Sequence, residues 1–153
     1  MASVYYAAWA FAAGALIPLM AILNAGLARA AGGQVQATVI LFATGLIAAL
    51  LLALATAVRL PDLQALARVA PQHYAGGVIV AFYVLSITFL APRFGVGNAI
   101  LFAVSAQLMT SALIDHLALA GATLRPLTPL RLVGLLIVIS GVVITQVSDR
   151  KAQ

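Results

Sequence analysis

Two adjacent ionisable residues, Asp115 and His116, end a long apolar stretch in a chain that has three acidic residues and no glutamate. A carboxylate inside a membrane helix is costly and by default predicts a functional group, and a neighbouring histidine suits a proton carrier. Residues i and i+1 do not share a helix face, so the two do not form a simple ion pair. Two hypotheses follow. The simpler one is a helix end whose charged side chains reach water, and the second is a pair of proton-coupling groups.

Uncharged polar side chains within apolar stretches are the candidates for a substrate pathway: Asn24, Tyr83, Ser86, Gln107 and Ser111. Gln107 falls at the centre of its stretch, where an amide must find a partner in protein or in a wet cavity. Each of these side chains could instead hydrogen-bond a neighbouring helix. The chain has no cysteine, and its sequence shows no nucleophile–base set and no metal-ligand cluster. We therefore expect non-covalent recognition, with no enzyme activity, metal or cofactor.

Membrane helices are the elements that must position these residues. Hydrophobic residues make up 65% of the 153 residues and charged residues only 7%, against about 25% charged residues in soluble domains. A spanning helix needs about 20 apolar residues, and charged residues interrupt this chain at about that interval. The sequence predicts one all-α domain with five spans, at about 4–27, 35–57, 74–90, 97–117 and 130–147. Residues 1–10 contain no Lys or Arg, so we expect no cleavable signal peptide.

The eight basic residues divide equally between the two sides of a five-span protein. Arg59, Arg68, Arg125 and Arg131 share the side of the N-terminus, and Arg29, Arg93, Arg150 and Lys151 lie on the other. The Lys/Arg bias sets orientation, so a tie indicates either chance or insertion both ways round. Insertion both ways would allow an antiparallel homodimer with ten helices. The basic residues are scattered, which indicates contact with the membrane surface and argues against nucleic-acid binding.

Small residues and one proline predict how the helices pack. Two seams with spacing that allows close helix approach are Gly45, Ala49 and Ala53 in the second span, and Gly134 and Gly141 in the fifth. These seams suit packing within the chain and also a dimer contact. Pro18 cannot donate a backbone hydrogen bond and presses on the preceding turn, so we expect a kink in the middle of the first span.

Several stretches resemble, in order and spacing, the YdcZ-like family of the drug/metabolite transporter superfamily: LNAGLARAAG (23–32), FATGLIAALLLA (42–53), SITFLAPRFGVGNAILF (86–102), QLMTSALIDHLALAG (107–121) and RPLTPLRLVGLLIVISGVVI (125–144). The residues that mark the resemblance are Asn24, Ala91 to Arg93, Gln107, Asp115 with His116, and Arg131 with Gly134. The resemblance implies a small inner-membrane exporter with about five spans, half of the ten in full-length members of the superfamily. It also implies dual topology, which some members are suspected to have.

These features together predict a bacterial inner-membrane protein that moves a small metabolite by alternating access, as an antiparallel homodimer of five-span subunits. The expected partners are a second copy of the chain, membrane lipid and a substrate that the sequence does not identify. Two other functions stay open. One is a dual-topology ion channel with a narrow polar pore, and the other is a subunit that pairs with an oppositely oriented relative.

Overall fold

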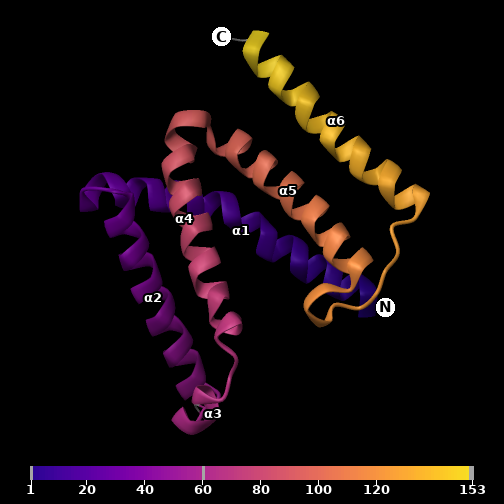
Figure 1. The fold of residues 1–153 in the computed structure, drawn as a ribbon. Helices are drawn as coiled ribbons and strands as arrows, with labels where there is room; N and C mark the ends of the chain where they lie inside the picture. The colour runs from indigo at the N-terminus through magenta and orange to yellow at the C-terminus, as the bar shows by residue number, and fades with distance from the viewer. Residues whose placement is uncertain (1, 60, 152–153) are drawn as a thin grey trace. The chain divides into compact units, whose positions relative to one another are not determined.

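The computed structural model describes residues 2–59 and 61–151, and every regular element in these ranges is helical. The elements (Figure 1) are α1 (Ala2–Ala31), α2 (Gln34–Ala55), α3 (Leu63–Ala67), the 3-10 helix η1 (Pro71–Tyr74), α4 (Ala75–Phe94), α5 (Val96–Leu117), the 3-10 helix η2 (Leu119–Gly121) and α6 (Pro129–Lys151). The chain forms two compact units that divide after Val96. The first contains α1 to α4 and the second contains α5 and α6, and each is described by itself.

Five of the helices are long and apolar enough to cross a membrane. The spans are Val4–Ala31, Gln34–Ala55, Pro71–Phe94, Val96–Leu117 and Pro129–Ser148. This confirms the predicted all-helical class and the count of five spans. The arrangement of all five as one domain stays a prediction.

The third span extends beyond the end that the sequence predicts. Leu90 was the expected last residue because Pro92 lacks a backbone donor, yet α4 continues through Pro92 to Phe94. A proline in the last turn removes only one helical hydrogen bond, so the helix tolerates it there. Gly95 ends the helix with a φ of 90°, a left-handed conformation that glycine adopts without steric cost.

The segment between the second and third spans holds a short helix, α3, where the sequence allowed at most a short interfacial one. The carboxylate of Asp62 accepts a hydrogen bond from the Gln64 backbone N–H at 3.3 Å and so caps the start of α3. The Tyr74 hydroxyl donates to the Leu66 carbonyl at 2.8 Å. The second of these contacts ties α3 to the last residue of η1, directly before α4.

Helices α1, α2 and α4 pack against one another in the first unit (Figure 1). The buried positions are small or β-branched: Ala21, Ala25 and Ala28 on α1, Ala37 and Thr38 on α2, and Val84, Ile87, Thr88 and Ala91 on α4. Small side chains let two helix backbones approach closely. The tightest packing of this unit therefore lies where α1 meets α4 and the start of α2.

The predicted small-residue seams take no part in this packing. A Cβ added at Gly45, Gly134 or Gly141 would meet no atom within 4 Å, and Ala49 is exposed and Ala53 only half-buried. The buried residues of α2 lie in its first two turns instead. A role of both seams in contacts with another chain stays a prediction.

Helix α1 is continuous through Pro18, and the kink expected there also stays a prediction.

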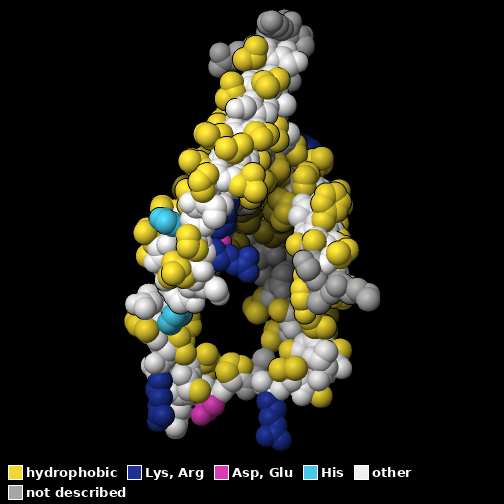
Figure 2. All heavy atoms as spheres, turned by 90° about the vertical axis from the view of Figure 1, so that its right-hand side faces the viewer, with side chains coloured by type: hydrophobic (Ala, Val, Ile, Leu, Met, Phe, Trp, Pro, Cys, Tyr) yellow, Lys and Arg dark blue, Asp and Glu magenta, His cyan; other side chains and the backbone are white. Residues whose placement is uncertain are grey.

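The outer surfaces of the helices are apolar. Within each span the buried share of residues is only 6% to 22%, so most side chains face outward. Figure 2 shows hydrophobic side chains over most of the face that it presents. Near the start of α1 the Tyr5 ring lies 6.1 Å from the Trp9 ring and 5.9 Å from the Tyr6 ring. Amphipathic rings in such a position suit the boundary between lipid and water.

Candidate functional site

The turn between α5 and α6 holds an ion pair. The Arg131 guanidinium donates to the Asp115 carboxylate at 2.7 Å, and the two side chains are 33% and 31% exposed. Asp115 lies in the last turn of α5 and Arg131 in the first turn of α6, so the pair closes the helical hairpin. Arg131 also donates to the Arg125 carbonyl at 3.4 Å. The carboxylate that the sequence singles out is therefore neutralised by a cation from the next helix.

Asp115 and its neighbour His116 hold the connecting segment against the end of α5. The backbone carbonyl of Asp115 accepts from the Arg125 N–H at 2.9 Å. The Nδ1 atom of His116 accepts from the Leu127 N–H at 3.1 Å. A ring nitrogen can accept a hydrogen bond only while it carries no hydrogen of its own, so this contact sets the orientation of the His116 ring.

These contacts favour the interpretation of Asp115 and His116 as a helix terminus that organises a turn. The chain reverses direction there through Ala118, Ala120 and Gly121, which all have positive φ values. A role of Asp115 and His116 in proton coupling stays a prediction. Protonation of His116 would remove the acceptor that the Leu127 N–H uses, so the geometry links any such role to the shape of the turn.

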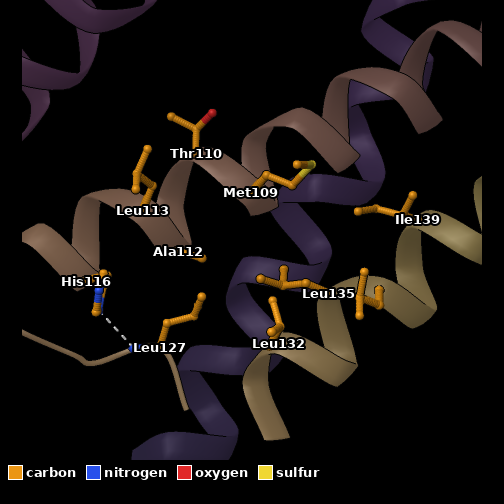
Figure 3. Close-up of a pocket in the computed structure, with 10 residues that line it drawn as sticks. Met109, Thr110, Ala112, Leu113, His116, Leu127, Leu132, Leu135 and Ile139 are labelled. Atoms are coloured by element: carbon orange, nitrogen blue, oxygen red, sulfur yellow. Dashed lines mark hydrogen bonds between the residues drawn. The ribbon is translucent and has the colours of Figure 1, made fainter. Parts of the chain in front are cut away.

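An apolar cavity of about 470 Å³ lies between α5 and α6, next to this turn. Figure 3 shows His116 beside Leu127 at one end, with Leu132 and Leu135 of α6 and Ile139 further along. Of the described residues that line it, Thr110 and His116 are polar and the others are apolar. Ligand cavities are typically about 300–1,000 Å³ and mostly apolar with a few polar groups. The cavity is suited to an apolar part of a small molecule.

A second polar contact fastens the other end of the hairpin. The Gln146 side-chain amide of α6 donates to the Asn98 side-chain oxygen of α5 at 2.7 Å. The sequence interpretation missed this pair, although an amide in each of two apolar helices was a signal for it. With Asp115–Arg131 at one end and Asn98–Gln146 at the other, polar contacts join α5 and α6 on both sides of the apolar cavity.

The predicted pathway residues divide between the two units. Asn24 is buried in α1, at 5% exposure, while Tyr83 and Ser86 are half-buried in α4. Gln107 and Ser111 are exposed on α5, and neither lines the apolar cavity. The Ser111 hydroxyl donates to the Leu108 carbonyl of its own helix at 3.0 Å. The structure thus gives Asn24 a protein environment and leaves Gln107 on an outer face.

Comparison with known families decides the identity of the chain. A family model described as "Putative inner membrane exporter, YdcZ" matches residues 5–144. The chain belongs to this family. The YdcZ match begins within the first turn of α1 and ends within α6, and it includes the second, third and fourth spans completely. No curated protein and no solved structure matches the chain.

Family membership and the five spans together place the protein in the inner membrane as a multi-pass protein. The YdcZ family is one of exporters by its description, which assigns this chain to membrane transport in broad terms. The description assigns no substrate.

Proposed function

We propose that the protein exports a small metabolite by alternating access and that its working unit is an antiparallel pair of copies. The observation that carries this proposal is the incomplete enclosure of its cavities. Among the described residues, α5, α6 and their connecting segment alone line the apolar cavity of the second unit, and at most 22% of the residues are buried in the apolar window of any span. A closed pathway needs further helices, and a second copy supplies them as the other half of a ten-helix transporter.

The opposite orientation of the second copy is supported by the charge distribution. Each side of the membrane receives four basic residues, so neither orientation is favoured by the Lys/Arg bias. Two copies that insert in opposite directions form the inverted repeat that many transporters contain within one chain. The exposed seams at Gly45 and Gly134 offer surfaces for close contact between such copies.

The residues of each copy have complementary roles in this proposal. The apolar cavity holds the apolar part of the substrate, and hydrogen bonds come from Asn24, Tyr83, Ser86, Gln107 and Ser111. Gln107 is exposed on α5, and an uncharged amide in mid-membrane needs a polar partner. A water-filled pathway or a bound substrate between two copies supplies that partner. Asp115 and His116 are the candidate coupling groups at the end of the hairpin.

The experiment compares cells that express the chain, the Gln107→Leu variant, or neither. Small molecules in the medium are measured by mass spectrometry, and any metabolite that accumulates is then loaded into proteoliposomes with the purified protein. We expect accumulation and efflux with the wild-type chain and a loss of about tenfold with Gln107→Leu, because one polar partner of the substrate is removed. Efflux unchanged by the variant, with equal amounts of folded protein, would contradict the pathway role.

Two other outcomes would replace the proposed mechanism. Single-channel currents far above transporter turnover would identify an ion channel with a narrow polar pore. A chain that stays monomeric alone and assembles only with a related protein of opposite orientation would identify a subunit of a heteromeric transporter.

A further inference from the structure

A different cavity, of about 610 Å³, lies in the first unit where α1 ends, α2 begins and α4 ends. Its polar lining comes from all three helices and the turn between α1 and α2: Arg29, Gly32, Gly33, Gln34, Thr88 and Arg93. Spans alternate in direction, so the ends of the first and third spans share one side of the membrane. This basic cavity therefore lies at the membrane surface and has two arginines on its wall.

Arg93 is held in place by its own helix. Its guanidinium lies 3.8 Å from the centre of the Phe89 ring, and one N–H donates to the Phe89 carbonyl at 2.8 Å. A guanidinium has five N–H donors, so most of them stay available for another acceptor. Stacking and the backbone contact fix the orientation of the side chain before any ligand binds, which reduces the entropy lost on binding.

The positive charge of the basic cavity has no acidic counterpart in its unit. Arg29 has no ion pair or side-chain hydrogen bond within residues 4–59 and 61–148. The only acidic residue in positions 1–96 is Asp62, which caps α3 beyond the far end of α2. Helix α2 has 22 residues, a length of about 33 Å. At that distance Asp62 is largely screened from both arginines.

Neutral donors complete the wall. Thr88 is only 2% exposed, and its hydroxyl has no hydrogen-bond partner among the residues whose side chains the structure describes. No fully buried polar side-chain atom among the described residues lacks a partner, so the Thr88 hydroxyl is accessible from the cavity and can donate to a ligand there. Gly33 and Gln34 also line the cavity at the start of α2, where no side chain caps the free N–H groups of the first turn.

We propose that this basic cavity binds a phosphate group. Two guanidinium groups, a hydroxyl and a helix N-terminus together offer more donors than the two oxygens of a carboxylate can accept, and they match the several oxygens of a phosphate. The cavity is within the range of ligand sites, about 300–1,000 Å³. At the membrane surface the phosphate comes either from the headgroup of an anionic phospholipid or from a soluble phosphate compound.

The test measures binding to the purified full-length chain in a maltoside detergent, which contains no phosphate. Calorimetric titrations use short-chain phosphatidylglycerol, inorganic phosphate, and a diacylglycerol with the same tails but no phosphate. The variants are Arg29→Gln, Arg93→Gln and Thr88→Val, and the matched control is Arg59→Gln, which removes one exposed arginine on the opposite side of the membrane. Circular dichroism and size-exclusion chromatography verify that each variant is folded.

We expect each cavity arginine variant to weaken phosphate binding by about tenfold, because a charge-assisted hydrogen bond is lost. Thr88→Val should weaken it by about threefold, and Arg59→Gln by less than about twofold. If phosphatidylglycerol binds and shows these losses while inorganic phosphate binds weakly, the phosphate group in the cavity belongs to a lipid headgroup. The same pattern with both probes identifies a soluble phosphate compound.

The proposal is overturned if neither phosphate probe binds, if diacylglycerol binds as well as phosphatidylglycerol, or if Arg59→Gln weakens binding as much as the cavity variants. Arg29→Gln decides the matter if Arg93→Gln does not fold, because Arg29 makes no described contact that supports the fold. Binding is measured without transport. A negative result therefore leaves the proposed exporter activity untouched.

Discussion

Arg131 at the start of α6 and Arg93 at the end of α4 are both arginines at a helix end, but their surroundings differ. Arg131 lies 2.7 Å from the Asp115 carboxylate and fastens two helices together. Among the residues whose side chains the structure describes, Arg93 interacts with the Phe89 ring and carbonyl of its own helix and with no carboxylate, and it lines the basic cavity together with Arg29. The presence of an acidic partner makes one arginine a structural contact, and its absence leaves the other available to an anionic ligand.

The largest effect is expected when the basic cavity receives a carboxylate, because its arginines then have an acidic partner as Arg131 does. Gln34→Glu places a carboxylate on the cavity wall at the start of α2. We expect phosphate binding to fall by about tenfold or more, because the new carboxylate pairs with the arginines and repels the ligand. The calorimetric titration with phosphatidylglycerol and with inorganic phosphate measures this loss.

Gln36→Glu is the matched control for this change. It adds the same charge to the first turn of α2, but Gln36 does not line the basic cavity. Both variants stabilise the helix N-terminus by a similar amount, about 0.5 kcal/mol. Equal loss of binding in the two variants would contradict the location of the site.

The number of helices was predictable because single charged residues interrupt apolar runs at intervals that match the thickness of a bilayer. The packing of the helices against one another was not predictable. Alanine is so frequent in this chain that seams of small residues occur on every span, and the sequence favoured Gly45 on α2 where the structure buries Ala21, Ala25 and Ala28 on α1. Which seam is used depends on the direction in which each helix leaves its turn.

The ion pair between Asp115 and Arg131 is expected to contribute to the stability of the second unit, and this effect is smaller than the loss of phosphate binding. A double-mutant cycle with Asp115→Ala and Arg131→Ala should give a coupling free energy of about 1 kcal/mol, since both side chains are about one-third exposed and partly screened by water. The measurement is the free energy of unfolding in mixed detergent for the two single variants and the double variant. Strictly additive effects would show that the pair does not stabilise the hairpin.

The smallest expected effect concerns His116. A phenyl ring cannot accept a hydrogen bond, so the His116→Phe variant removes the acceptor of the Leu127 N–H and the segment 118–128 becomes less protected. The loss of this exposed hydrogen bond is expected to cost about 0.5 kcal/mol, a factor of about two in exchange protection. Hydrogen exchange of this segment in the wild-type chain and in the variant, at one pH, measures this factor.

Equal protection of the segment 118–128 in the wild-type chain and in His116→Phe would show that this hydrogen bond does not hold the turn.

The candidate sites differed in how far the sequence could predict them. Asp115 and His116 stood out as ionisable residues in an apolar stretch, but their partners Arg131 and Leu127 follow only from closure of the hairpin. The basic cavity was missed, because Arg29 and Arg93 are far apart in the sequence and each alone is typical of a loop at the membrane surface. Only the packing of α1 against α4 brings the two arginines to one wall.

The central claim is that two copies of the chain insert in opposite directions. The chain has no cysteine, so Ala152→Cys creates a single thiol after α6, and intact cells are treated with a membrane-impermeant thiol reagent. The account predicts that about half of the protein reacts, since the Lys/Arg bias favours neither orientation. Reaction of all of the protein or of none would show a single orientation and contradict the antiparallel homodimer.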